Sequence, residues 1–145
     1  MSQPLHSRSC VINVINPNMT ATMTDLIAAA AQASAAPGTR IVGRTAQFGA
    51  ASIEGHYDEA IAAVGMLREI AAGDTDGCDA HVIACFGDPG LLAARELSAA
   101  PVLGIAEAAM HAASFLATRF SVVTTLSRTK VIAEHLVRNY GMEHH

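Results

Sequence analysis

Cys85 is the side chain whose type and position best fit catalytic chemistry. It ends the apolar run AHVIAC over residues 80–85, and Asp88 and Pro89 follow closely. Asp at the N-cap and Pro at the first helical position are a strong signal for the start of a helix. Because a helix N-terminus carries partial positive charge, it favours the thiolate form of a nearby cysteine. We therefore expect a catalytic thiol at Cys85; the other interpretation is a small buried apolar residue, as free cysteines often are.

The other two cysteines are expected to lie far from Cys85 and to be structural. Cys78 precedes Cys85 by seven residues, which is about 23 Å of extended chain at roughly 3.3 Å per residue. Cys10 lies six residues before Asn16, or about 20 Å by the same rise. Both cysteines therefore belong to the opposite edge of the sheet, where neither can contact the same substrate as Cys85.

The loops that follow the predicted strands carry amides, hydroxyls and a thiol, and they contain no lysine, arginine or histidine. In an open parallel sheet, ligands bind beyond the carboxyl ends of the strands, where such loops meet. These groups suit a neutral or mildly anionic small molecule better than a phosphate. Capping, turns or strand preference are competing explanations for the asparagine and the threonines. The candidate substrate-binding residues are Asn16, Ser52, Phe86, Gly87, Thr124 and Thr125.

No metal or cofactor is expected from the sequence. His56, His81 and His111 do not stand at a spacing typical of metal ligands. Neither GxGxxG nor GxxxxGK[ST], the glycine-rich patterns that bind nucleotide phosphates, is present. The acids expected near the site, each of which also suits a helix N-terminus, are Glu54, Asp88 and Glu107.

The elements that must position these residues alternate five times between strand and helix. This spacing predicts βαβ units, and the short connections favour an α/β fold with a doubly wound parallel sheet. We expect a single lobe over residues 1–145, because no repeat, linker or low-complexity segment interrupts the pattern. The expected strands span 10–15, 40–45, 80–85, 101–104 and 120–125, and the expected helices 20–35, 56–72, 89–98, 106–118 and 127–140.

Composition and charge exclude several classes of protein. Of the 145 residues, 51% are apolar and 15% are charged, which excludes disorder and provides a sizeable core. A net charge of −4 argues against nucleic acid or an anionic membrane as a partner. No apolar run is long enough to span a bilayer, and residues 1–8 lack the apolar core of a signal peptide. Three cysteines without an export signal then indicate reduced thiols and a cytoplasmic protein.

Five segments, in the same order along the chain, resemble the hydantoin racemase branch of the aspartate/glutamate racemase superfamily. The resemblance runs from Val11 to about Gly141, and its second and third segments together are specific. The first segment favours hydantoin and allantoin racemases over amino-acid racemases, and Ala50 departs from the usual proline. The segments are INPN at 15–18, SIEGHYDE at 52–59, CFGDPG at 85–90, PVLGIAEAA at 101–109 and VVTT at 122–125.

The resemblance implies a flavodoxin-like lobe of the racemase fold and proton transfer with neither cofactor nor metal. A thiolate removes the proton of a carbon between a carbonyl and a nitrogen, and a thiol on the opposite face returns one, which inverts the centre. Cys85 matches the first of the two family cysteines, and the amides of Phe86 and Gly87 are placed to stabilise enolate-like charge. The positions expected to bind the ring amides are matched by Asn16, Ser52 and Thr124.

In that family a second, similar lobe supplies the second cysteine. This chain matches one lobe, and Cys10 and Cys78 are expected too far from Cys85 to replace the other thiol. We therefore expect a fragment that holds half of an active site and is inactive alone. Its uncovered apolar face predicts a homo-oligomer.

Two other functions stay open at this point. Other members of the superfamily isomerise maleate or decarboxylate arylmalonates, also with cysteine, so the fold is compatible with another reaction. A non-catalytic binding or assembly domain is the remaining hypothesis. Turnover of a dicarboxylate indicates the former, and ligand binding without proton exchange indicates the latter.

Overall fold

The computed structural model describes residues 9–145, and four of its strands form one parallel sheet. These are β1 (Cys10–Asn16), β2 (Thr39–Thr45), β3 (Ala80–Ile83) and β4 (Val102–Gly104), in the order β2-β1-β3-β4. The chain adds β2 on one side of β1 and then β3 and β4 on the other. The predicted doubly wound parallel sheet is therefore confirmed, with its switch point between β1 and β3.

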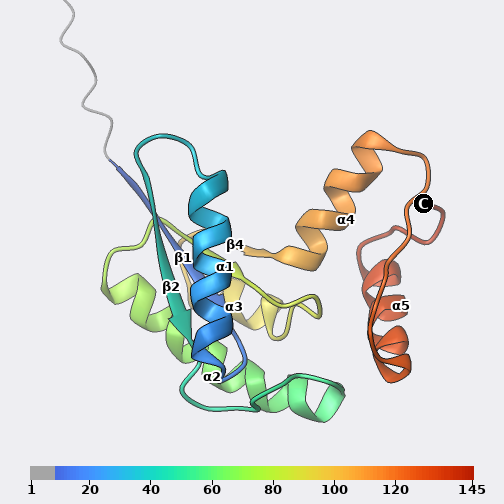
Figure 1. Cartoon of the computed structure of the whole chain (residues 1–145), viewed down its shortest axis with the longest axis horizontal. Helices are drawn as coiled ribbons and strands as arrows, with labels where there is room; N and C mark the ends of the chain where they lie inside the picture. Colours follow the sequence, from blue (N-terminus) through green and yellow to red (C-terminus); the bar gives the residue numbers. More distant parts are fainter. Residues whose placement is uncertain (1–8) are drawn as a thin grey trace, which may run out of the picture.

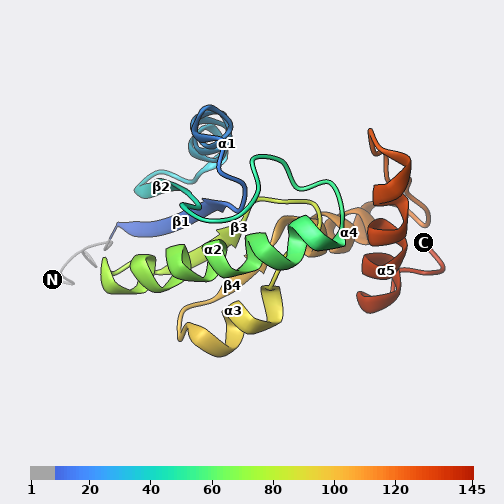
Figure 2. The same ribbon diagram turned by 90° about the horizontal axis from the view of Figure 1, so that it is seen from below.

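Helices cover both faces of this sheet. α1 (Ala21–Ser34) lies on one face, and α2 (His56–Thr75) and α3 (Leu91–Leu97) lie on the other (Figures 1 and 2). The main core forms between the sheet and these last two helices, because the β-branched and aliphatic strand residues meet the apolar stripes of the helices there. Its buried members are Ile15, Met66, Ile70, Ile83, Leu91, Ala94 and Val102.

A second apolar cluster lies at one end of the sheet. α4 (Ile105–Leu116) follows β4 directly, and a 3-10 turn (Ser127–Thr129) leads into α5 (Lys130–Asn139). Figure 2 shows both helices beyond the end of the sheet. They pack against each other through Ala106, Met110, Ile132, Leu136 and Met142. In the described part of the chain, no helix is long and apolar enough to cross a membrane.

The expected fifth strand over residues 120–125 is wrong. Among the described residues this segment forms no helix and pairs with no strand. Its side chains alternate as in a strand, since Phe120 and Val122 pack on the second cluster while Val123 is 93% exposed. A β-branched run indicates a preference for strand but does not supply a partner, and α4 carries the chain away from the sheet (Figure 1). Residues 9–145 therefore contain four paired strands.

Gly65 on α2 permits a close contact between that helix and the loop before it. A methyl group at Gly65 would lie 1.9 Å from the carbonyl oxygen of Phe48. We expect Gly65→Ala to lower the free energy of unfolding by about 2 kcal/mol, because the backbone must shift to relieve the overlap. This exceeds the roughly 1 kcal/mol that alanine contributes to a helix. Urea denaturation followed by circular dichroism measures the change.

Gly55→Ala is the matched control for this prediction. Gly55 has extended backbone at φ −169°, and a methyl group there would meet nothing within 4 Å. Gly55 is the N-cap of α2, where alanine is less favourable than glycine, so its substitution should cost no more than about 1 kcal/mol. If Gly65→Ala and Gly55→Ala lowered the free energy of unfolding equally, the close contact at Gly65 would not be the cause of the loss.

Candidate active site

A pocket of about 400 Å³ brings together six of the seven residues predicted for the site. The loop before α2, the loop after β3, and the segment before α5 meet there, although they lie far apart in the sequence. The predicted residues that line the pocket are Cys85, Ser52, Phe86, Gly87, Thr124 and Thr125. The carboxyl edge of the sheet therefore gathers the groups that the sequence placed at strand ends.

Cys85 lies just beyond β3, where the strand end is held against β1. The backbone N–H of Ala84 donates to the carbonyl oxygen of Ile15 at 2.8 Å, and the carbonyl of Cys85 accepts from the N–H of Asp88 at 3.0 Å. The thiol is half-buried. Burial raises its pKa to about 11, the carboxylates of Glu59 and Asp88 add to that rise, and the Gly87 N–H opposes it. At neutral pH Cys85 is therefore a thiol.

The expected N-cap role of Asp88, at a helix that begins at Pro89, is wrong. α3 begins at Leu91, after Gly90, so Asp88 is not its N-cap. Instead the Asp88 carboxylate accepts the N–H groups of Ala106 at 3.0 Å and Glu107 at 2.8 Å. It therefore caps α4, a helix that begins much later in the chain. The Asp-Pro pair predicted a helix start directly after it. In the tertiary fold the Asp88 carboxylate instead accepts hydrogen bonds from the free N–H groups in the first turn of α4.

Asn16 lies at the same edge of the sheet but does not line the pocket. Its side chain is buried, and Nδ2 donates to Asn18 Oδ1 at 2.8 Å and approaches the oxygens of Thr20 and Thr24. Its Oδ1 accepts the Asn18 N–H at 3.2 Å. In this structure the amide shapes the β1–α1 loop, and its contact with substrate stays a prediction.

Thr124 presents a hydrogen-bond acceptor to the pocket. Its hydroxyl lies 2.5 Å from that of Thr129, and Thr129 donates its own proton to the carbonyl oxygen of Leu126 at 2.7 Å. Since a hydroxyl has a single proton, Thr124 must be the donor in the pair. Its lone pairs are then available to an N–H group of a ligand.

Glu59 is a residue of this pocket that the sequence reasoning missed. It stands in the first turn of α2, where an acid is expected simply from the helix dipole. A methyl group at Gly87 would lie 3.0 Å from Glu59 Oε1 and 3.9 Å from Cys85 Sγ, so both groups border the same point of the loop. The expected acid Glu54 also lines the pocket and forms an ion pair with Arg128.

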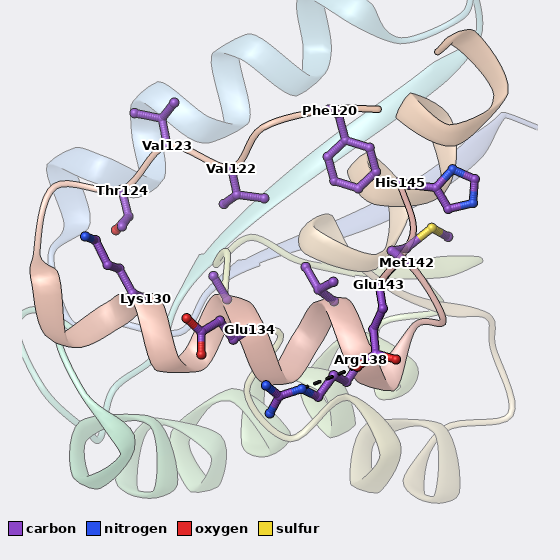
Figure 3. Close-up of a pocket in the computed structure, with 12 residues that line it drawn as sticks. Phe120, Val122, Val123, Thr124, Lys130, Glu134, Arg138, Met142, Glu143 and His145 are labelled. Atoms are coloured by element: carbon purple, nitrogen blue, oxygen red, sulfur yellow. Dashed lines mark ion pairs between the residues drawn. The ribbon is translucent and has the colours of Figure 1, made fainter. Parts of the chain in front are cut away.

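A larger pocket of about 590 Å³ lies on the other side of the segment before α5. Figure 3 shows Phe120 and Val122 directed toward α5, while Val123 points away from it. This pocket contains one predicted site residue, Thr124, and no cysteine. The smaller pocket at Cys85 is therefore the better candidate for acid–base chemistry.

The remaining cysteines and histidines lie where they do not contribute to the Cys85 pocket. Cys10 opens β1 and Cys78 precedes β3, so both stand at the opposite ends of their strands. His81 is buried in β3, with Nδ1 3.0 Å from Asn13 Nδ2 and Nε2 2.8 Å from Asp74 Oδ1. Within residues 9–145 no group of three or more metal-ligating side chains is placed to hold a metal ion.

Known proteins of similar sequence and structure identify the family. Residues 12–145 match the family described as Asp/Glu/Hydantoin racemase. The chain is 52% identical over 132 residues to a hydantoin racemase of Pseudomonas sp. (strain NS671), which covers 91% of the chain and 53% of that relative. It is 48% identical over 134 residues to a hydantoin racemase of Rhizobium meliloti, which covers 92% and 56%, respectively.

Two solved structures share the fold closely. Allantoin racemase from Klebsiella pneumoniae matches with a TM-score of 0.92 and 62% identity, over 94% of this chain and 56% of that one. Allantoin racemase from Pseudomonas fluorescens matches with a TM-score of 0.87 and 42% identity, over 91% and 56%. The chain thus spans about half the length of these relatives. Taken with the match over residues 12–145, these similarities show that the chain belongs to the Asp/Glu/hydantoin racemase family.

Proposed function

We propose that this chain forms one wall of the active site of a racemase that acts on 5-substituted hydantoins or on allantoin. The observation that carries the proposal is the lining of the Cys85 pocket, where a thiol lies among hydroxyl-bearing and apolar residues. None of the described residues that line it is lysine, arginine or histidine, whereas Glu54 and Glu59 are acidic. A dicarboxylate would meet repulsion there, and a neutral cyclic amide would not. The names of the relatives support the same substrate class.

In the proposed reaction Cys85 exchanges a proton with the substrate carbon that lies between a carbonyl and a nitrogen. As a thiol, it donates its proton to the carbanion, so that the S–H bond breaks, a C–H bond forms and a thiolate remains. For the opposite enantiomer the same thiolate removes the proton. Thr124 accepts a ring N–H through its lone pairs, which orients the ring. Proton transfer of this kind requires neither cofactor nor metal.

The group on the opposite face of the substrate must come from outside the described pocket. Cys10 and Cys78 stand at the far ends of their strands. We assign the second acid–base group to the part of the relatives that this chain does not span. The proposed activity therefore requires that part together with Cys85 of this chain.

Deuterium exchange tests the proposal. The chain is joined in frame to the part of the Klebsiella pneumoniae allantoin racemase that follows the matched region. The product is incubated in D₂O with a 5-substituted hydantoin, with allantoin, and with maleate and an arylmalonate. We expect deuterium at the stereocentre of the cyclic amides and no reaction of the carboxylates. Turnover of a carboxylate without exchange in hydantoin would overturn the substrate class, and binding without any exchange would support a non-catalytic domain.

A further inference from the structure

We propose that Glu59 is a positioning residue that holds Cys85 in its protonated form, through a carboxylate placed beside the thiol. The inference rests on the proposed function, because it concerns the state in which Cys85 enters proton transfer. The protonation of the thiol is, however, measurable without any substrate.

The approach of Glu59 to the loop after β3 depends on Gly87. A methyl group at Gly87 would lie 3.0 Å from Glu59 Oε1 and 3.9 Å from Cys85 Sγ. Any side chain at position 87 would push the carboxylate back. The first turn of α2 and the glycine of the loop together bring a negative charge to the thiol.

The other carboxylate oxygen of Glu59 is held by a histidine. His56 Nδ1 lies 3.2 Å from Glu59 Oε2, and the His56 ring stacks on His135 of α5 with ring centres 5.8 Å apart. The Glu59 side chain is only 21% exposed, so water and salt screen its charge less than at the surface. One oxygen is thus anchored and the other faces the loop of Cys85.

The remaining charged groups around Cys85 are engaged elsewhere. Asp88, in the same loop, accepts two amides of α4 and the hydroxyl of Tyr140. Glu54, before α2, is paired with Arg128 of the turn before α5. Glu59 and Asp88 both disfavour the thiolate of Cys85, and Glu59 has the larger electrostatic effect of the two. Burial is the main cause of the raised pKa of Cys85, to about 11, and the Glu59 carboxylate is the next largest.

A negative charge beside the sulfur affects both directions of the proposed transfer. It disfavours the free thiolate, so Cys85 is protonated before the transfer. Once the S–H proton has moved to the carbanion, repulsion from Glu59 makes the thiolate a stronger base, which retakes a proton more readily. Glu59 thereby adjusts the acid–base strength of Cys85 without contacting the substrate.

Alkylation of the thiol across a pH series tests this role. The chain carries Cys10→Ser and Cys78→Ser, so that iodoacetamide reports on Cys85, and ultraviolet absorbance of the thiolate provides a second readout. We expect Glu59→Gln to lower the apparent pKa of Cys85 by about one unit. Alkylation on the acidic side of the titration should then be about tenfold faster. Glu59→Asp retains the charge at a greater distance from the thiol. The apparent pKa of Cys85 in this variant should lie between those of the parent and of Glu59→Gln.

Glu54→Gln is the matched control, because it removes a carboxylate from the same pocket that is already paired with Arg128. It should leave the titration of Cys85 unchanged. The proposal is overturned if Glu59→Gln titrates like the parent, or if Glu54→Gln shifts the thiol as much. If the glutamine variant does not fold, the aspartate variant carries the same comparison. Because the readout is alkylation, a failure here is separate from a failure of substrate exchange.

Discussion

Cys85→Ser should lower deuterium exchange at the stereocentre of a 5-substituted hydantoin by about 10²- to 10⁴-fold, the contribution typical of one acid–base group. Serine occupies nearly the same volume in the pocket, but its hydroxyl is a far weaker acid than the thiol. The loop after β3 should keep its conformation, since the backbone bonds at Ala84 and Asp88 do not involve the side chain of residue 85. The measurement is the exchange rate in D₂O of the joined protein described above.

Cys10→Ser is the matched control for this prediction. It makes the same chemical change at an exposed residue at the opposite edge of the sheet. Its exchange rate should equal that of the parent. Exchange retained in Cys85→Ser would contradict the assignment of Cys85 as an acid–base group.

Asp88→Ala should lower the free energy of unfolding by about 2 to 3 kcal/mol, through loss of a helix cap and of a partner for a partly buried hydroxyl. The carboxylate accepts the N–H groups of Ala106 and Glu107 and the hydroxyl of Tyr140 at 2.7 Å. Burial and this carboxylate raise the pKa of Tyr140 above its ordinary range, so the phenol keeps the proton that it donates. One side chain thus ties the loop after β3 to both α4 and α5. Urea denaturation followed by circular dichroism measures the loss.

Two further variants check the cause of this effect. Tyr140→Phe removes one of the three hydrogen bonds and should cost about 1 kcal/mol. Asp25→Ala removes an exposed carboxylate of α1 and should stay within about 0.5 kcal/mol of the parent. A loss for Asp88→Ala no larger than that for Asp25→Ala would contradict the capping role.

The order of the elements was readable from the sequence because each strand has a local signal. β-branched runs of strand length, such as CVINVI at 10–15, alternate with helical stretches, and this alternation predicted the doubly wound parallel sheet. The rule that loops gather at the carboxyl edge then placed Ser52, Phe86 and Thr124 near Cys85. The structure brings them to one pocket, although their catalytic and binding roles remain proposals.

Residues 120–125 show where a local pattern is insufficient. Their β-branched residues predict a strand, but in the structure the segment pairs with no strand, and it has Val122 packed and Val123 exposed. A strand also needs a neighbour that supplies backbone partners. Whether residues 120–125 lie beside another strand depends on the direction in which α4 carries the chain. No short segment of the sequence encodes that direction.

The sequence by itself determined the strand–helix order, the position of Cys85 at a strand end and the family resemblance, because these depend on neighbouring residues in the chain. Only the tertiary structure decided which partners meet across long separations. Asp88 caps α4 and not α3, and Glu59 of α2 faces the loop that contains Gly87. Burial, and after it these carboxylates, raise the pKa of Cys85, where the sequence predicted a thiolate stabilised by a helix. The physical reason is that charge and burial act through space, so the acidity of Cys85 depends on residues that the sequence keeps apart.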